Sequence, residues 1–308
     1  MGRWIQKTSM PTPRHDLQAV AAGGKTYAIS GADDLTLDVV EIYDVATDTW
    51  AQGPPIPTRR GWLGADLLED RIYVAGGKTI RTPAEKESSG DDTHFEVQNV
   101  LEVLDLGSRT WSALAPLPQG RAGVGVAACQ GKLYMLGGSI MKDGHAADAL
   151  DVYDPQRAQW SAGPAYPFPV MGPGLIAVED RLYAIAGSSN AFGNGFSFRP
   201  EVHVLDPQVG KWERLAAKPR GWESMGITVL DGKIFAFGGR ADGGYHDTVD
   251  IYDIKTDSWS SDTPMPVGKA WLDACTVDGR IFALGGAYGR GAPQGEYVWI
   301  DDLHEFVP

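Results

Sequence analysis

A thirteen-residue pattern occurs five times in this chain of 308 residues, and no copy contains an insertion. Each copy has an alternating apolar segment, a turn led by aspartate and a tryptophan that opens the next apolar segment. The copies span residues 38–50, 99–111, 148–160, 200–212 and 247–259. Alternation with a period of two is typical of half-buried strands, and aspartate favours the turn that joins them. The repeats indicate one self-similar array and override the expectation of about two domains from length alone.

A second pattern precedes the first and occurs six times, at residues 24–31, 70–77, 131–138, 180–187, 232–239 and 279–286. It holds a turn, a basic residue, an apolar strand and a pair of small residues. The sixth copy has no tryptophan after it, because aligning Asp302 with Asp247 places the last residues on the third strand of that unit. Trp4 supplies the missing tryptophan. Residues 1–8 are therefore predicted to complete a sixth unit with residues 269–308.

These residues resemble the repeats of the kelch family across essentially the whole chain. The resemblance lies in the double-glycine strand, as in Gly76-Gly77, in the (Glu/Asp)-x-(Tyr/Leu)-Asp strand and in the tryptophan that follows. Successive tryptophans of this set are 46 to 61 residues apart, near the kelch period of about 50 residues. The resemblance implies an all-β fold in which residues 1–308 form a single domain. That domain would be a six-bladed β-propeller of four-stranded antiparallel blades, closed by the N-terminal strand joining the C-terminal blade.

Composition and charge exclude several functional classes. A hydrophobic content of 43% supports a sizeable core. A net charge of −13 argues against nucleic acid or an anionic membrane surface as a partner. Cys129 and Cys275 fall in units three blades apart, so no disulfide is expected. The chain has neither a signal-like start nor a long apolar run, which favours a cytoplasmic location, although a protein with a trimmed signal peptide would look the same.

The kelch resemblance implies that two sets of segments share one face of the ring. One set joins the second and third strands of each blade, at residues 32–37, 78–98, 139–147, 188–199, 240–246 and 287–301. Blades 2, 4 and 6 have the longest of these loops, and long loops on a rigid scaffold commonly carry recognition. The other set leads into the inner strand of each blade.

Counting back from the basic residue of each second strand gives six equivalent positions before the inner strands: Arg14, Arg60, Arg121, Val170, Trp222 and Lys269. Two residues later come Asp16, Trp62, Gly123, Gly172, Ser224 and Trp271. Blade 5 is predicted to contain a two-residue insertion, because Arg220-Gly221-Trp222 matches Arg60-Gly61-Trp62 only if the register shifts. The prediction is a cationic, aromatic mouth that binds a ligand through Arg14, Arg60, Trp62, Arg121, Arg220, Trp222, Lys269 and Trp271, with Arg59 beside them.

Structural roles are the alternative for both residue types. The arginines would then satisfy carbonyl groups between blades, and the extra tryptophans would pack beneath loops. If they are exposed, the arginines suit carboxylates through paired hydrogen bonds, and the tryptophans suit a sugar, an aromatic ring or a peptide.

Four candidate acid–base residues share the predicted mouth: His15, Asp16, Glu223 and Asp273. Salt bridges are the ordinary alternative for them. No metal site is predicted, because the histidines lack paired ligands at a recognised spacing. Glu87, Asp91 and His94 resemble the iron-binding motif of plant specifier proteins in the kelch family, but the last gap is one residue short. No cofactor is expected.

Two functional hypotheses follow. In the first, the mouth is a binding site for an anionic small molecule, a carbohydrate or an acidic peptide. In the second, the chain is a small isomerase, epimerase or lyase acting on an anionic sugar or a carboxylated metabolite, as its resemblance to the six-bladed kelch epimerases of sialic acid implies. The sequence does not indicate an oligomeric state.

Overall fold

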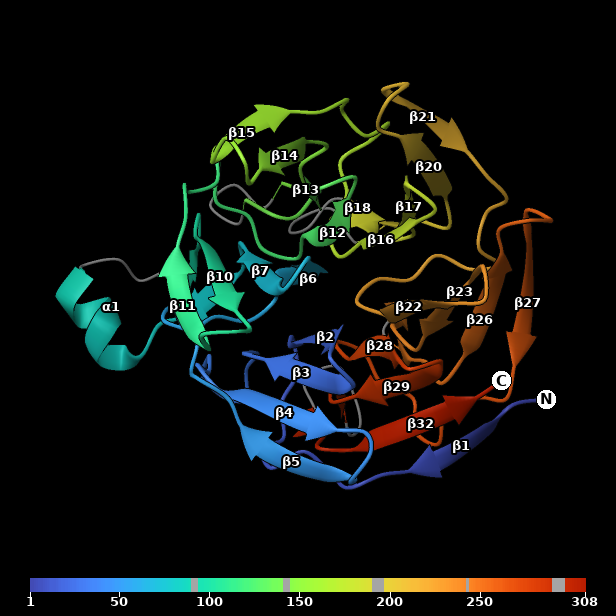
Figure 1. Cartoon of the computed structure of the whole chain (residues 1–308), viewed down its shortest axis with the longest axis horizontal. Coiled ribbons are helices and arrows are strands. Elements are labelled where there is room, and N and C mark those ends of the chain that lie inside the picture. The colour runs from blue at the N-terminus through green and yellow to red at the C-terminus, as the bar shows by residue number, and fades with distance from the viewer. Residues whose placement is uncertain (90–93, 141–144, 190–196, 242–243, 290–296) are drawn as a thin grey trace.

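Six four-stranded antiparallel sheets surround a central axis in the computed structural model, which describes residues 1–89, 94–140, 145–189, 197–241, 244–289 and 297–308 (Figure 1). The innermost strand of each sheet faces the axis and the fourth strand lies at the rim. Buried apolar side chains form clusters between neighbouring sheets, as in the group around Tyr43 and Phe282 that joins blades 1 and 6. The predicted six-bladed β-propeller is confirmed.

The blades follow one another in chain order. Blade 1 has β2 (Gln18–Ala22), β3 (Lys25–Ile29), β4 (Val40–Asp44) and β5 (Thr49–Gln52). Blade 2 has β6 (Gly64–Leu68), β7 (Arg71–Ala75), β10 (Leu101–Asp105) and β11 (Thr110–Ala113). Blade 3 has β12 (Gly125–Cys129), β13 (Lys132–Leu136), β14 (Leu150–Asp154) and β15 (Gln159–Ala162).

The second half of the ring has the same plan. Blade 4 has β16 (Gly174–Val178), β17 (Arg181–Ile185), β20 (Val202–Asp206) and β21 (Lys211–Arg214). Blade 5 has β22 (Gly226–Leu230), β23 (Lys233–Phe237), β26 (Val249–Asp253) and β27 (Ser258–Asp262). Blade 6 has β28 (Asp273–Val277), β29 (Arg280–Leu284), β32 (Leu303–Val307) and β1 (Arg3–Gln6).

The N-terminal strand closes the ring, as predicted. β1 pairs antiparallel with β32, with Arg3 opposite Val307 and Gln6 opposite His304. The ring of Trp4 packs against Phe306 and Phe237, with centroids 4.8 Å and 5.6 Å away. The two ends of the chain therefore share one sheet, and both lie at the same place on the rim (Figure 1).

The repeated tryptophans are structural. Each donates its indole N–H to a backbone carbonyl of the chain leaving the preceding blade, at 2.8–3.1 Å. The six residues are Trp4, Trp50, Trp111, Trp160, Trp212 and Trp259. Each indole thus contributes apolar packing and one interblade hydrogen bond.

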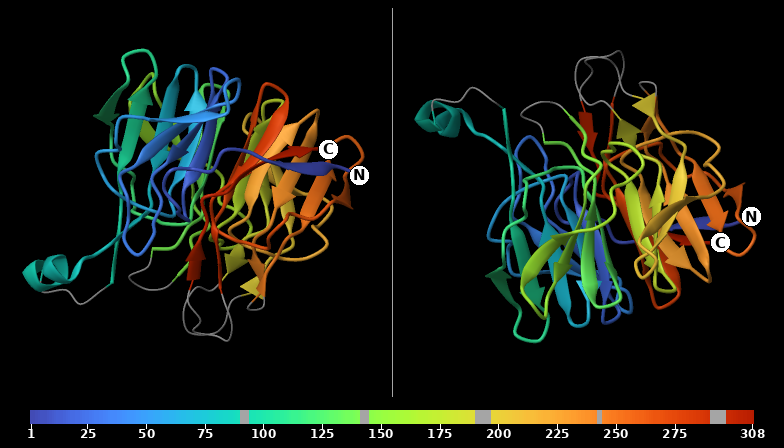
Figure 2. Two further views of the ribbon diagram at one scale, coloured as in Figure 1. Left: turned by 90° about the horizontal axis from the view of Figure 1, so that it is seen from below. Right: turned by 90° about the horizontal axis from the view of Figure 1, so that it is seen from above.

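Four short hairpins extend the loops on one side of the ring, which we call the loop face (Figure 2). They are β8 (Lys78–Ile80) with β9 (Phe95–Val97), β18 (Ser188–Ser189) with β19 (Ser197–Phe198), β24 (Arg240–Ala241) with β25 (Gly244–Tyr245), and β30 (Ala287–Gly289) with β31 (Tyr297–Trp299). The helix α1 (Pro83–Ser89) projects beyond the rim on the same side (Figure 2). In the described ranges, no helix has the length and apolar character needed to cross a membrane.

Candidate functional site

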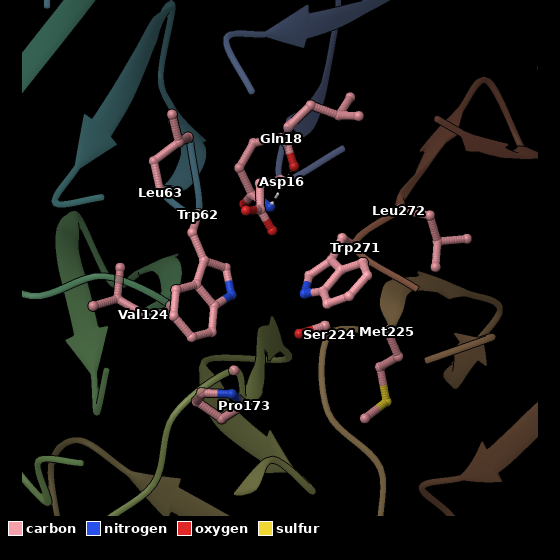
Figure 3. A pocket seen from close by; sticks show the side chains of 13 residues that line it. Asp16, Gln18, Trp62, Leu63, Val124, Pro173, Ser224, Met225, Trp271 and Leu272 are labelled. Atoms are coloured by element: carbon pink, nitrogen blue, oxygen red, sulfur yellow. Dashed lines mark hydrogen bonds between the residues drawn. The ribbon is translucent and has the colours of Figure 1, made fainter. Parts of the chain in front are cut away.

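Six equivalent residues, one from each blade, surround the channel opening on the loop face (Figure 3). We call them the mouth ring: Asp16, Trp62, Gly123, Gly172, Ser224 and Trp271. They line a small pocket of about 70 Å³. These are the six positions that counting along the repeats had aligned, so the unshifted alignment places them correctly.

A closed circle of backbone hydrogen bonds joins the members of the mouth ring. The amide of each donates to the carbonyl of the member in the preceding blade, and Asp16 donates to Trp271 to close the circle. Five of the six N···O distances are 2.7–3.0 Å, and the bond from Ser224 to Gly172 is 3.5 Å. The opening is therefore framed by backbone whose polar groups are already satisfied, and the side chains decide its chemistry.

All six members have a left-handed backbone, with φ between 55° and 66°. Glycine adopts this conformation without a steric penalty, and blades 3 and 4 use Gly123 and Gly172. A bulky residue with positive φ is a strained exception. Trp62 and Trp271 nevertheless occupy it, at 55° and 56°.

The two tryptophans face each other across the opening, and their ring nitrogens point inward (Figure 3). Both side chains are partly exposed. Trp62 lies over Gly123, where an added Cβ would come within 2.7 Å of the indole. The Nζ atom of Lys78 is 4.5 Å from the centroid of the Trp62 ring and 4.9 Å from that of the Phe95 ring. These contacts hold the indole in place while its N–H remains open to the channel.

Asp16 supplies the negative charge at the mouth. Its Oδ2 atom is 3.4 Å from Nδ1 of His15 and 3.6 Å from Nζ of Lys78. Burial opposes ionisation, but Lys78 and His15 outweigh it and lower the pKa of Asp16. Asp16 Oδ1 and Ser224 Oγ are buried and have no hydrogen-bond partner within the described ranges. The mouth thus offers an ionised acceptor and a hydroxyl group beside two indole donors.

Four of the predicted ligand-binding cations do not line the mouth, and that prediction is wrong. Arg14, Arg60, Arg121 and Lys269 are at most 2% exposed and lie between the blade and its inner-strand connection. Each pairs with a carboxylate: Glu41, Glu102, Asp151 and Asp302, respectively. Arg60 also donates to the carbonyls of Thr58, Val74 and Gly76. The alternative of structural arginines that satisfy carbonyls is the one observed.

Blade 5 shows why the shifted register is wrong. The carbonyl of Trp222 accepts the hydrogen bond from Gly187, as that of Arg60 accepts one from Gly31. Trp222 therefore occupies the position of the buried arginine and is only 1% exposed. Lys218, four residues earlier, provides the cation and pairs with Asp250 at 2.5 Å. Arg220 is exposed, and Arg59 pairs with Glu85 beside α1 rather than at the mouth.

The acid–base candidates do not converge. Glu223 is 1% exposed, and its two oxygens accept hydrogen bonds from Ser188 and Arg240. Asp273 lies in the inner strand β28, where its Oδ2 accepts the amide of Ala19 in the next blade at 2.8 Å. Burial raises the pKa of Asp273 to about 7 and that of Asp66, also on an inner strand, to about 6. Only His15 and Asp16 remain together at the mouth.

Sequence reasoning missed an aromatic cluster beside the mouth. Trp271 contacts Tyr245 and Tyr297, with centroids 5.8 Å and 6.0 Å away. Tyr297 stacks on Trp299, which stacks in turn on His15 at 4.5 Å. Tyr297 is 50% exposed. The available signal was Trp299, which lies in the long loop 287–301 and belongs to neither repeated pattern.

The described residues hold no group of three or more metal-binding side chains. His94 Nδ1 is 2.9 Å from Nζ of Lys86. Asp91, which completes the resemblance to an iron-binding motif with Glu87 and His94, lies outside the described residues. Cys129 and Cys275 are buried free thiols.

Comparison with known proteins agrees with the repeat assignment. The family model for the kelch motif matches residues 13–57, 120–165 and 224–266. Human Kelch-like protein 15 is 22% identical over 81% of this chain and 34% of its own length. Human Kelch-like protein 25 is 30% identical over 45% of this chain and 23% of its own length. Mouse Kelch-like protein 35 is 29% identical over 44% of this chain and 21% of its own length. The chain thus spans between about a fifth and a third of the length of these relatives.

A solved structure, that of YjhT, shares the fold. It superposes with a TM-score of 0.76 over 96% of each chain, at 17% sequence identity.

Proposed function

We propose, given that this chain belongs to the kelch-repeat family, that its loop face is a protein-binding surface centred on the mouth ring. A segment of the partner would lie across the opening and insert one side chain between Trp62 and Trp271. Tryptophan, tyrosine and arginine are the residues that most often dominate protein interfaces. The aromatic cluster of Tyr245, Trp271, Tyr297 and Trp299 extends this surface over blades 5 and 6.

The observation that carries the proposal is the left-handed backbone of Trp62 and Trp271. Glycine suits that conformation and is present at the same position in two other blades, so the fold does not require an indole there. Backbone strain that the fold does not require is commonly retained at functional sites. A binding role for the two indoles would explain why tryptophan, rather than glycine, occupies these two positions.

The chemistry of the pocket favours a side chain that both accepts and donates hydrogen bonds. The two indole N–H groups of Trp62 and Trp271 can donate to an acceptor, while the buried Oδ1 of the ionised Asp16 needs a donor. A primary amide, such as that of glutamine or asparagine, meets both needs. A pocket of about 70 Å³ is smaller than the sites of roughly 300–1,000 Å³ that hold whole small molecules. It therefore suits one inserted side chain better than a sugar ring.

The enzyme hypothesis is not favoured by this geometry. Glu223 is fully engaged, and Asp273 does not line the mouth pocket. His15 and Asp16 alone do not form an acid and a base on opposite sides of a substrate.

The test is selection of extended peptides from a random displayed library on the whole protein, followed by measurement of the affinity of the enriched peptides for the Trp62→Gly/Trp271→Gly variant. We expect enriched peptides to bind the unchanged protein and to lose about 30-fold or more in affinity for the variant, because two aromatic anchors are removed. A glutamine-to-glutamate change in the enriched peptide should weaken binding further. Val209→Asp is the control, because Val209 is 69% exposed in a turn at the rim of blade 4.

Stability measurements distinguish a binding role from a structural one. Trp62→Gly should change the free energy of unfolding by no more than about 1 kcal/mol, because relief of left-handed strain offsets the lost contacts. Trp111→Gly, which removes a structural tryptophan, should cost about 3–5 kcal/mol. Peptides that bind the glycine variant as well as the unchanged protein would refute the proposal.

A further inference from the structure

A second pocket lies on the loop face between blades 4 and 5 and encloses about 500 Å³. Among the residues that the structure describes, none lines both this pocket and the mouth pocket. We call it the side pocket; its lining residues are Ser197, Phe198, Arg220, Gly221, Trp222, Ala241, Gly244 and His246. Its volume falls in the range of sites that hold small molecules.

The segment 220–224 contributes to both pockets, and Glu223 anchors it between them. Trp222 faces one pocket and Ser224 the other. The backbone of Glu223 pairs with Arg240, and its carboxylate accepts hydrogen bonds from Ser188 and Arg240. Gly221 touches the neighbouring hairpin so closely that an added Cβ would lie 2.3 Å from the carbonyl oxygen of Phe198. The wall of the side pocket is therefore held by blade contacts rather than by a free loop.

Two buried polar atoms of the side-pocket residues have no partner. Trp222 is 1% exposed, and its indole Nε1 has no hydrogen-bond acceptor within the described ranges. His246 Nε2 is likewise buried and unpartnered there. A buried donor without an acceptor is costly and rare in folded proteins. An acceptor delivered by a ligand would satisfy Trp222.

The charge at the side pocket is positive. Arg220 is exposed, and no hydrogen bond or ion pair joins it to another described residue. Burial is the main cause that lowers the pKa of His246, and the positive charges of Arg220 and Lys218 add to it. The neighbouring Asp250 forms an ion pair with Lys218, at 2.5 Å, and Asp247 is an acidic residue whose charge acts on His246. An arginine with free donors beside an indole N–H matches the two oxygens of a carboxylate.

We infer that the side pocket binds a carboxylate attached to an apolar body, independently of the mouth ring. The carboxylate would accept hydrogen bonds from Arg220 and from Nε1 of Trp222. The apolar body would lie along Phe198 and the flat backbone of Gly221 and Gly244. Such a group occurs in a small aromatic acid and equally at the C-terminus of a peptide.

The test uses the whole protein labelled with ¹⁵N at its ten tryptophans. Phenylacetate is the free carboxylate, and phenylacetamide is its neutral counterpart. A short peptide ending in phenylalanine, with a free or an amidated C-terminus, represents the chain-terminal source. Trp222→Phe identifies the Trp222 indole signal, and thermal melting confirms that each variant is folded.

We expect phenylacetate or the free-ended peptide to shift the Trp222 indole signal, while the amide counterparts do not. A response to phenylacetate indicates a small acid, and a response to the peptide alone indicates a chain terminus. Arg220→Gln should weaken the affinity about tenfold or more, because the charged partner of the carboxylate is removed. Arg214→Gln is the matched control, because Arg214 is an exposed arginine on the outer strand β21.

Two results would overturn the inference: no shift of the Trp222 signal with either carboxylate, or unchanged affinity in Arg220→Gln. The Trp62→Gly/Trp271→Gly variant should retain carboxylate binding at the side pocket. This variant separates the two sites, since failure of the mouth proposal would leave the result at the side pocket unaffected.

Discussion

Two aspartates beside the channel have pKa values that depend on contacts with the neighbouring blade. Asp66 and Asp273 lie on inner strands, and each accepts a backbone amide from the next blade, Ala128 and Ala19 respectively. These hydrogen bonds favour the charged form, but burial acts more strongly in the opposite direction and raises the pKa of both carboxyl groups. The charge of Asp66 raises the pKa of Asp273 further.

The raised pKa of Asp273, at about 7, predicts a pH-dependent stability. An unfolded aspartate titrates near pH 3.9, so between about pH 4 and 7 the folded protein binds more protons than the unfolded chain. The contribution of Asp273 to stability is therefore largest below pH 4 and is lost as the pH rises through 7. Asp273→Asn keeps an acceptor for Ala19 and should be more stable than the unchanged protein at pH 8, by about 1–3 kcal/mol.

Urea unfolding at pH 5 and pH 8 measures this pH dependence of stability. The stability difference between Asp273→Asn and the unchanged protein should grow from the lower pH to the higher one. Asp34→Asn serves as the control, because Asp34 is exposed. A difference that stays constant with pH would show that Asp273 does not titrate in this range.

At the scale of elements, an ion pair joins the segment that leads into the inner strand to the third strand of the same blade in blades 1, 2, 3 and 5. In blade 6 the carboxylate is Asp302, directly before the third strand. In blade 2, Arg60 is 2.5 Å from Glu102 and also satisfies three carbonyls. These cations position the mouth ring, whose members lie two residues later in blades 1, 2, 3 and 6 and six residues later in blade 5.

Arg60→Met should therefore act on stability. It leaves the buried carboxylate of Glu102 without its cation, and removal of one member of a buried ion pair typically costs about 3–5 kcal/mol. Glu102→Leu in the same chain should recover part of this loss, since the unpaired charge is then gone. Arg71→Met in the same blade is the control: Arg71 pairs with Asp105 at the surface and should change stability little.

Chemical denaturation of the three variants decides the role. A loss of stability in Arg60→Met no larger than that in Arg71→Met would contradict the structural assignment.

At the scale of the whole molecule, closure depends on β1. This strand pairs with β32 over four residues, and Trp4 fills the space between Phe237 and Phe306. The segment after β1 reaches blade 1, where the carbonyl of Thr8 accepts the indole N–H of Trp50. Blades 6 and 1 are thus joined by the first eight residues as well as by the packed core around Phe282.

Deletion of residues 1–8 should destabilise the ring strongly and expose the edge of β32 to other chains. The loss of Trp4 alone, which is partly buried against Phe237 and Phe306, should cost up to about 3–5 kcal/mol. Thermal melting and size-exclusion chromatography should show a lower Tm and aggregation. A synthetic peptide of residues 1–10 should partly restore the Tm by adding the missing strand. A truncated chain that melts like the full one would contradict this account of closure.

The sequence by itself determined the number of blades, their strand order, the closure of the ring and the six positions of the mouth ring. It could do so because strand period and turn chemistry are local properties that recur with each repeat. The tertiary structure alone decided which side chains are available to a ligand. Arg60 and Trp62 are two residues apart, yet one is buried against Glu102 and the other borders the channel, because the partner carboxylate comes from another strand.

Contacts between separate strands and loops also explain what sequence reasoning missed. In blade 5, Trp222 occupies the position that a buried arginine has in blades 1 to 3, and Lys218, four residues before it, provides the cation. The cluster of Tyr245, Trp271 and Tyr297 assembles from separate loops. Contacts between segments distant in the chain depend on how blades pack, and no local pattern records that packing.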